Sequence, residues 1–153
     1  MPTRPRVFLD SSTLFAGVWS QAGGTRMLLK LGETGTVQIL LSAQVLDEVE
    51  SALRRKAPAA LGYLTILVDR SVAEVVPDAA PEVIARCREL IPHSGGARIL
   101  AAAWSAQADF LVTLDRVHFL NDPNLKSAIP FSLATPGDFL SWYRGTLQDL
   151  LRG

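Results

Sequence analysis

Short runs of apolar, β-branched and aromatic residues alternate along the chain with longer stretches in which apolar residues recur at helical spacing. Strands that alternate with helices are typical of βαβ units, so this pattern predicts an α/β sandwich around a parallel sheet. The segment Lys56–Gly62, which holds a proline and a glycine, is expected to join two helices rather than two domains. The predicted strands are Arg6–Leu9, Val37–Leu41, Ala73–Val76 and Phe110–Thr113.

Three helices can be placed from their apolar stripes. One follows Ser42, a second has Ser94 as its expected N-cap, and the last begins at Thr135 with a proline in its first turn. We expect the aromatic stripe of the last helix to cover the sheet, with a partner-binding face as the alternative. The stripes are Val45, Leu46, Val49, Ala52 and Leu53, then Ala97, Leu100, Ala101 and Trp104, and finally Phe139, Leu140, Trp142, Tyr143, Leu147 and Leu150.

Length and composition fit one globular domain covering residues 1–153, with 48% hydrophobic residues for a core. Fifteen Lys and Arg balance fifteen Asp and Glu, which excludes a strongly basic protein that coats nucleic acid. The single cysteine, Cys87, excludes a disulfide framework and is expected in a half-buried helix position. The longest apolar run, Ile99–Trp104, is far shorter than a membrane span. Because three apolar residues near the start run directly into Asp10, we expect no signal peptide and a cytoplasmic protein.

Acidic residues follow two of the predicted strands. Asp10 comes directly after Val7–Leu9 and precedes two serines, and Asp115 follows an apolar run in the same way. In parallel α/β sheets, ligands bind outside the carboxyl ends of the strands. If these two strands are neighbours, both carboxylates lie at one edge of the sheet. The alternative is that each aspartate only caps the turn or helix that follows it.

A third acidic side chain is expected from the helix after Ser42. Helical geometry places Glu48 near one edge of the apolar stripe and Glu50 near the other, while Asp47 faces water. This periodicity leaves the choice between the two glutamates open. Clustered carboxylate oxygens suit Mg²⁺ or Mn²⁺, which would activate water and stabilise charge on a phosphodiester.

Four blocks of sequence carry a family resemblance: VFLDSSTLFAG, LLSAQVLDEVESALRRK, ARILAAAWSAQADFLVTLDRVHFL and IPFSLATPGDFLSWY. Together they span about Arg6 to Tyr143, and their order resembles the PIN domain family, in particular bacterial PIN proteins of toxin–antitoxin pairs. The resemblance implies a three-layer α/β/α sandwich with a mainly parallel central sheet. It also implies a ribonuclease that cleaves single-stranded RNA with Mg²⁺ or Mn²⁺, an antitoxin partner and a homodimer.

The resemblance also assigns residues. Asp10 matches the acid of the first strand, and Asp115 matches the acid of the Val-Thr-x-Asp block. Glu48 matches the family glutamate in the pattern Leu-x-Glu-Val, which selects it over Glu50. Ser12 falls where the family usually has a small polar residue near the metal. The resemblance therefore implies that Asp10, Glu48 and Asp115 bind the metal and act in catalysis.

One position departs from the family pattern. PIN domains usually carry another aspartate where this chain has Gly96, so the expected four acids are reduced to three. Asp109 cannot replace it, because it begins the strand that Asp115 follows, about 20 Å away at roughly 3.3 Å per residue. Asp122, in the next loop, would have to fold back toward the site. A commonly acidic family position is His93 in this chain.

The histidines and glycines near this position offer other chemistry. His93 would supply an imidazole to a softer metal, or else be an exposed loop residue, whereas His118 is expected to have a local structural role. Gly95 and Gly96, followed by Arg98, would place free backbone N–H groups at a helix N-terminus, where an RNA phosphate could bind.

Basic and aromatic residues suggest further RNA contacts. Arg54, Arg55 and Lys56 form the tightest basic cluster, and they either contact phosphates or stabilise the C-terminus of their helix. Trp19 is expected to pack in a core or an interface, with base stacking as the alternative.

Three other classes of function can be compared with the sequence. A catalytically inactive PIN-fold module that binds RNA or a partner would explain Gly96. A phosphatase-like use of Asp10 as nucleophile is disfavoured, because Ser12 occupies the position of the second acid such enzymes need. No G-x-G-x-x-G follows the first strand, which argues against a dinucleotide site.

Overall fold

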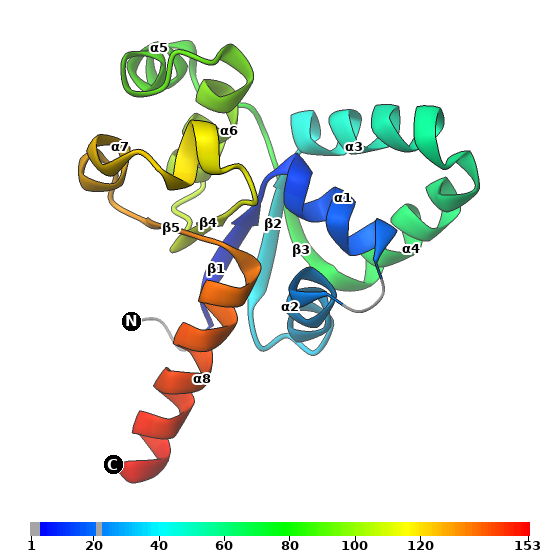
Figure 1. Cartoon of the computed structure of the whole chain (residues 1–153), viewed down its shortest axis with the longest axis vertical. Coiled ribbons are helices and arrows are strands. Elements are labelled where there is room, and N and C mark those ends of the chain that lie inside the picture. The colour runs from blue at the N-terminus through cyan, green and yellow to red at the C-terminus, as the bar shows by residue number, and fades with distance from the viewer. Residues whose placement is uncertain (1–3, 21–22) are drawn as a thin grey trace.

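Five parallel strands form one sheet at the centre of the computed structural model (Figure 1). The structure describes residues 4–20 and 23–153, with the backbone alone at residue 94. The strand order across the sheet is β3-β2-β1-β4-β5, so β1 lies in the middle and pairs with both β2 and β4. The strands are β1 (Arg6–Leu9), β2 (Gln38–Ser42), β3 (Val72–Val76), β4 (Phe110–Val112) and β5 (Ser132–Ala134).

The central strands are built from continuous apolar runs, as expected for a parallel sheet covered on both faces. Val7, Phe8 and Leu9 of β1 are all fully buried. The four strands predicted from the sequence are confirmed to within one residue at each end. The sequence pattern missed β5, because this edge strand has only three residues and its first, Ser132, is exposed.

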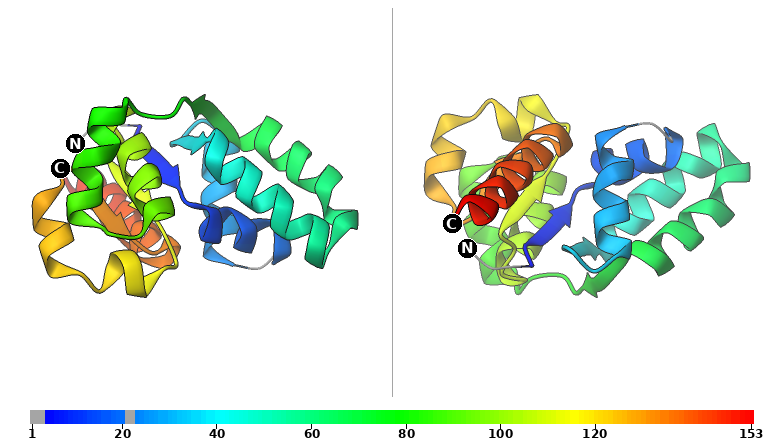
Figure 2. Two further views of the ribbon diagram at one scale, coloured as in Figure 1. Left: turned by 90° about the horizontal axis from the view of Figure 1, so that it is seen from above. Right: turned by 90° about the horizontal axis from the view of Figure 1, so that it is seen from below.

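Helices lie in two groups on either side of the strands, with α1 to α4 on one side and α5 to α8 on the other (Figure 2). This arrangement confirms the predicted α/β/α sandwich. The helices are α1 (Ser11–Trp19), α2 (Gly24–Glu33), α3 (Ala43–Lys56), α4 (Leu61–Ser71), α5 (Pro81–Leu90), α6 (Ser94–Ser105), α7 (Pro123–Ala128) and α8 (Pro136–Arg152), with a 3₁₀ turn η1 (Pro58–Ala60) and a short π-helix η2 (Arg116–Leu120).

Helix starts follow the capping chemistry read from the sequence, with one correction. The Ser42 hydroxyl accepts the Val45 N–H at 3.3 Å and starts α3. Thr135 and Asp138 form a complete capping box at the start of α8. The prediction of Ser94 as the cap of α6 is wrong, because the ring of His93 caps this helix by accepting the Gly96 N–H.

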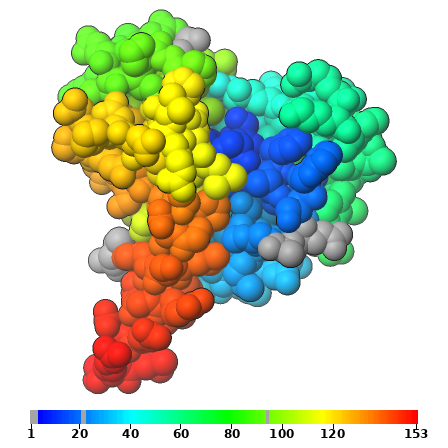
Figure 3. Space-filling model, in the orientation of Figure 1, coloured from blue at the N-terminus to red at the C-terminus, as the bar shows by residue number. Residues whose placement is uncertain are grey.

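The last helix covers the sheet only along its first half. Phe139 is fully buried and packs edge-on against Phe110 of β4, with ring centroids 4.9 Å apart. Farther along, Leu147 is 43% exposed and Leu150 is 71% exposed, as the helix projects from the body of the molecule (Figure 3). The predicted lid is therefore confirmed for its aromatic half and wrong for its leucine-rich end.

Three smaller predictions concern the junction between α3 and α4, the burial of Cys87 and membrane-spanning helices. The segment Lys56–Gly62 does join two helices, through the η1 turn between α3 and α4. Cys87 is fully buried in α5 rather than half-buried. Within the described part of the chain, no helix combines the length and the apolar character that crossing a membrane requires.

Candidate active site

Asp10 lies at the carboxyl end of β1, where the chain turns into α1. Its carboxylate caps α1 by accepting the Thr13 N–H at 3.0 Å, and its own N–H donates to the carbonyl of Val112 on β4 at 3.2 Å. The side chain is buried, with 3% exposed. Asp10 therefore does cap the helix that follows it, as the alternative prediction held, and it also places a carboxylate at the carboxyl end of the central strand.

Asp115 lies at the matching end of β4, three residues after Val112. It caps the η2 π-helix, because one carboxylate oxygen accepts the His118 N–H at 3.0 Å. The other oxygen pairs with the His118 ring nitrogen Nδ1 at 2.9 Å. Since β1 and β4 are neighbours, the two aspartates share one edge of the sheet, as the sequence predicted.

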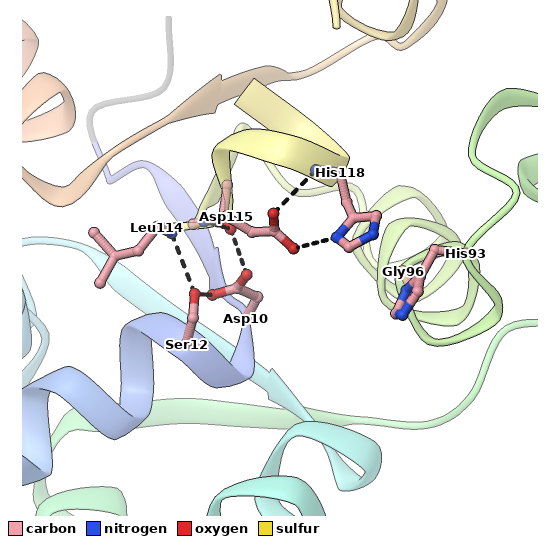
Figure 4. Close-up of polar contacts among 8 residues, drawn as sticks. Asp10, Ser12, His93, Gly96, Leu114, Asp115 and His118 are labelled. Atoms are coloured by element: carbon pink, nitrogen blue, oxygen red, sulfur yellow. Dashed lines mark hydrogen bonds and ion pairs between the residues drawn. The ribbon is translucent and has the colours of Figure 1, made fainter. Parts of the chain in front are cut away.

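Two hydroxyl groups join these aspartates into one network (Figure 4). The Thr113 hydroxyl donates to Asp10 and accepts the Asp115 N–H at 3.0 Å. The Ser12 hydroxyl donates to the other Asp10 oxygen at 2.8 Å and accepts the Leu114 N–H at 3.2 Å. Sequence analysis found Ser12 but missed Thr113, whose hydroxyl at the end of an apolar strand was the available signal.

The two carboxylates have opposite electrostatic environments. Burial raises the pKa of Asp10, although hydrogen bonds from Thr113, Thr13 and Ser12 oppose the shift. Partial burial also acts to raise the pKa of Asp115, but the hydrogen bonds and charge of His118 outweigh it and bring that pKa below its ordinary value. In the described structure no cationic side chain pairs with Asp10. A cation bound at this point would therefore offset the cost of burying its charge.

Glu48 lies beside this network on α3 and is exposed. Its carboxylate accepts a hydrogen bond of 3.5 Å from the Ser11 hydroxyl, and both residues line a hollow of about 310 Å³ between α1 and α3. Glu50 faces the other way and pairs with Arg54 at 3.7 Å, and Asp47 is exposed as predicted. Of the two glutamates, Glu48 is thus the one on the side of Asp10.

The start of α6 is occupied differently from the sequence expectation. The Gly96 N–H is bound to the ring of His93, and Arg98 is engaged in an ion pair with Asp78 at 3.1 Å. The structure therefore does not bring Gly96 and Arg98 together as an open phosphate site. His93 is exposed and lies in the loop directly before α6, which confirms the alternative of an exposed loop residue, and its ring also caps the helix.

Neither of the other nearby aspartates supplies a fourth acid. Asp109 accepts the Arg6 N–H at 2.7 Å at the opposite end of β1 and β4, which confirms its exclusion. Asp122 caps α7 by accepting the N–H groups of Asn124 and Leu125 and does not fold back toward Asp115.

The predicted RNA contacts lie around α1 and the end of α3. Lys56 has its ammonium group 5.4 Å from the centre of the Phe15 ring, and Trp19 stacks on the same ring at 5.7 Å. Trp19 is 60% exposed, so it does not pack in the core, and packing in an interface and base stacking both stay predictions. Arg55 is exposed, whereas Arg54 forms an ion pair with Glu50.

The donor set suits a hard cation that keeps part of its water shell. Mg²⁺ in proteins is usually held by one or two carboxylates together with water and substrate phosphate. Asp10 and Asp115 supply two carboxylates and Glu48 stands beside them. Within residues 4–20 and 23–153, no three or more His, Cys, Asp or Glu side chains form a group that could hold a metal ion. A third ligand would thus come from movement of Glu48, from water or from the substrate.

Comparison with known families assigns the fold. The model of the PIN domain family matches residues 6–117 of the chain. The chain belongs to the PIN domain family. No curated protein matches it, but solved structures do. This PIN domain shares 17% identity and a TM-score of 0.64 with a chain of VapBC2 from Rickettsia felis, solved bound to a DNA fragment from its promoter, over 84% of this chain and 96% of that one.

Two further solved structures have the same fold. PAE2754 from Pyrobaculum aerophilum is 17% identical with a TM-score of 0.59, over 85% of this PIN domain and 89% of that chain. VapC20 from Mycobacterium tuberculosis, described as a toxin that cleaves the sarcin–ricin loop, is 15% identical with a TM-score of 0.54, over 72% and 91%. At these identities the similarity shows the fold, while activity has to be argued from the site.

Proposed function

We propose that the chain is an endoribonuclease that cleaves single-stranded RNA with Mg²⁺ or Mn²⁺ held by Asp10, Glu48 and Asp115. The observation that carries the proposal is the convergence of Asp10 and Asp115, from two neighbouring strands of a PIN domain, on one hydroxyl-bridged network. This network lies where the strand order changes direction between β1 and β4, which is the usual ligand site of open α/β sheets.

Each residue has a distinct role in this proposal. A divalent cation, when bound, would promote attack by water and offset the negative charge that develops on the phosphate. Asp10 and Asp115 hold the cation from the floor of the site, and Glu48 completes the set from α3. Thr113 and Ser12 fix the Asp10 carboxylate by donating to both of its oxygens, so its orientation is set before substrate arrives.

The RNA-binding surface extends from this site over α1 and the end of α3. Arg55 and Lys56 offer cations to phosphates, and exposed Trp19 offers a ring on which a base can stack. Arg54 joins this surface if RNA displaces Glu50, and Arg98 only if RNA displaces Asp78.

We also propose that the chain is the toxin of a toxin–antitoxin pair and forms a homodimer. The toxin role is supported by the similar structures, one of which is a VapBC2 complex and another a VapC toxin, whereas the homodimer is only what the family resemblance of the sequence implies. Light scattering on the purified chain would give its oligomeric state directly.

A cleavage assay tests the proposal. Fluorescent single-stranded RNA should be cut with Mg²⁺ or Mn²⁺ and not with EDTA, and Asp10→Asn, Glu48→Gln and Asp115→Asn should each reduce the rate at least tenfold. Asp47→Asn is the matched control, because Asp47 adjoins Glu48 in sequence but faces water. Equal rates in all four variants, or cleavage unaffected by EDTA, would refute the assignment.

A non-catalytic RNA-binding or partner-binding module is the second candidate, favoured by Gly96 and by the absence of a three-ligand group in the described residues. Thermal melts separate the two. A ligand at ten times its dissociation constant stabilises a protein by about 1.4 kcal/mol, which raises Tm by roughly 3–6 °C for a chain of this size. If Mn²⁺ raises Tm in the wild type and not in Asp10→Asn, the metal site is supported; RNA binding without any Mn²⁺ effect would favour the module.

A further inference from the structure

The two histidines of the chain lie side by side next to the candidate active site. His93 caps α6 and His118 belongs to η2, yet their ring centroids are 4.3 Å apart with 31° between the ring planes. Figure 4 shows His118 beyond Asp115 as seen from Asp10, with His93 farther out on the same side. The order along the site is therefore acid, acid, imidazole, imidazole.

A hydrogen bond fixes the orientation of each ring. An ionised carboxylate only accepts hydrogen bonds, so the 2.9 Å contact with Asp115 requires the proton of His118 to be on Nδ1. His93 has the opposite arrangement, because its Nδ1 accepts the Gly96 N–H at 3.0 Å and leaves its ring proton on Nε2. Asp115 is thus a positioning residue for His118, and the first turn of α6 positions His93.

Glycine at two positions makes room for the His93 ring. A Cβ atom on Gly96 would lie 3.4 Å from Nδ1 of His93, and one on Gly95 would lie 3.3 Å from its Cε1. Both distances are tighter than ordinary van der Waals contact. The lack of an acidic side chain at position 96 is therefore related to the histidine at position 93, because the His93 ring occupies the space beside Gly96.

The Nε2 atoms of both rings are available to a ligand. His93 is exposed and the His118 side chain is 41% exposed. Neither Nε2 atom has a hydrogen-bond partner among the residues that the structure describes. Because the contact with Asp115 holds a proton on Nδ1 of His118, the Nε2 atom of that ring is left for a hydroxyl group, whereas the His93 ring presents an N–H donor. Two adjacent ring nitrogens are thus left unbonded beside the carboxylates among the described residues.

This pair matches the chemistry of ribose. The 2′-hydroxyl is both donor and acceptor and distinguishes RNA from DNA, and the phosphate next to it only accepts. We propose that His118 binds a ribose 2′-hydroxyl and His93 binds the adjacent phosphate, so that this pair selects RNA over DNA. The inference rests on the proposed ribonuclease function and adds the residues that determine its substrate class.

Binding without metal tests the inference apart from cleavage. In EDTA, fluorescence anisotropy would measure dissociation constants for a short single-stranded RNA and for the DNA of the same sequence. A hydrogen bond contributes about 0.5–1.5 kcal/mol, so removing one should lower the preference for RNA about two- to tenfold. We expect this loss in His118→Phe, which keeps a ring for stacking. His93→Asn, which keeps an acceptor able to cap α6, should instead weaken the binding of RNA and DNA by a similar factor, because both strands carry the phosphate. Gln148→Ala on distal α8 should leave the preference unchanged.

The outcomes separate this inference from the proposed function. A preference for RNA that is the same in the wild type and His118→Phe, unchanged binding of both strands in His93→Asn, or a wild type that binds RNA and DNA equally or not at all, would overturn the inference. Metal-dependent cleavage is a separate readout and does not depend on that result. Loss of the preference in His118→Phe, together with weaker binding of both strands in His93→Asn, in a protein that does not cleave would support the histidine pair and refute the nuclease. Far-ultraviolet circular dichroism checks that each variant is folded.

Discussion

Replacing Gly96 by aspartate places a carboxylate at the third residue of α6, next to the His93 ring that borders the candidate active site. The backbone there is helical, so the change brings no strain of its own. A Cβ at this position would lie 2.9 Å from Cδ1 of Ile91, which is the free end of a flexible side chain, and 3.5 Å from Cζ of Phe119. The position is tight but can accept a side chain once Ile91 rotates.

The expected effect of Gly96→Asp on stability without metal is small. Replacing glycine by aspartate inside a helix gains only about 0.3 kcal/mol, because aspartate is itself a weak helix former, and a carboxylate in the first turn gains about 0.3–1 kcal/mol from the helix dipole. Crowding of a packed position costs about 1–3 kcal/mol, toward the low end here because only the tip of Ile91 must move. The free energy of unfolding should therefore change by no more than about 1 kcal/mol.

The expected effect on metal affinity is larger. A carboxylate about 4 Å from a cation contributes several kcal/mol at the effective dielectric constant of a protein surface. Part of this is lost in desolvating the new side chain and moving Ile91. We expect Mn²⁺ to bind about ten to a hundred times more tightly, or about 1.4–2.8 kcal/mol. Calorimetric titration with Mn²⁺ measures this directly.

Two variants isolate the charge in this experiment. Gly96→Asn has nearly the same shape without the negative charge, and Gly96→Ala reports crowding and helix propensity alone. Because a side chain at this position also approaches the His93 ring at 3.4 Å, all three variants should weaken the binding of RNA in the absence of metal. If Gly96→Asp binds Mn²⁺ no more tightly than Gly96→Asn, the missing acid does not limit metal binding and the reasoning fails.

Two other predictions concern stability. Gly32→Ala should lower the free energy of unfolding by about 1–3 kcal/mol, because the new Cβ would lie 2.5 Å from the carbonyl oxygen of Ser71. In the control, Gly145→Ala, the new Cβ meets no atom of a neighbouring element within 4 Å in the described structure, and the free energy of unfolding should rise by up to about 1 kcal/mol. Urea unfolding gives both values, and equal effects would contradict the packing argument. Because burial raises the pKa of Asp10 above 3.8, the wild type should lose stability relative to Asp10→Asn as pH rises from 3.8 through the folded-state pKa. The pKa of Asp115 is lowered from 3.8, so the wild type should instead lose stability relative to Asp115→Asn as pH falls from 3.8. Urea unfolding measured across this pH range checks both signs, and differences that change in the same direction for the two variants would contradict one of them.

Much of the fold could be predicted because local rules govern it. The buried run before Asp10 identifies β1, and the Thr135 capping box identifies the start of α8, since both depend on residues close together in the chain. The edge strand β5 has too few residues to show a period, and the exposed end of α8 carries an apolar stripe that nothing else in residues 4–20 and 23–153 covers. These are the places where hydrophobic periodicity gave too little or the wrong information.

The candidate site, like the fold, was predicted only in part from the sequence. Asp10, Glu48, Asp115 and Ser12 were identified from strand ends and family motifs. The bridging role of Thr113 was not, because its hydroxyl connects segments that are 103 residues apart. His118 was expected to act locally, and it does pair with Asp115, but its contact with the tilted ring of His93 could not be foreseen.

The sequence by itself determined which side chains stand at the carboxyl ends of strands and at the starts of helices. The tertiary structure decided that β1 and β4 are neighbours, so that two separate aspartates become one network, and that His93 and His118 become one pair. The physical reason is that hydrophobic periodicity records which face of an element is buried, whereas contacts between distant segments depend on the order in which strands pair and helices pack across the whole sheet.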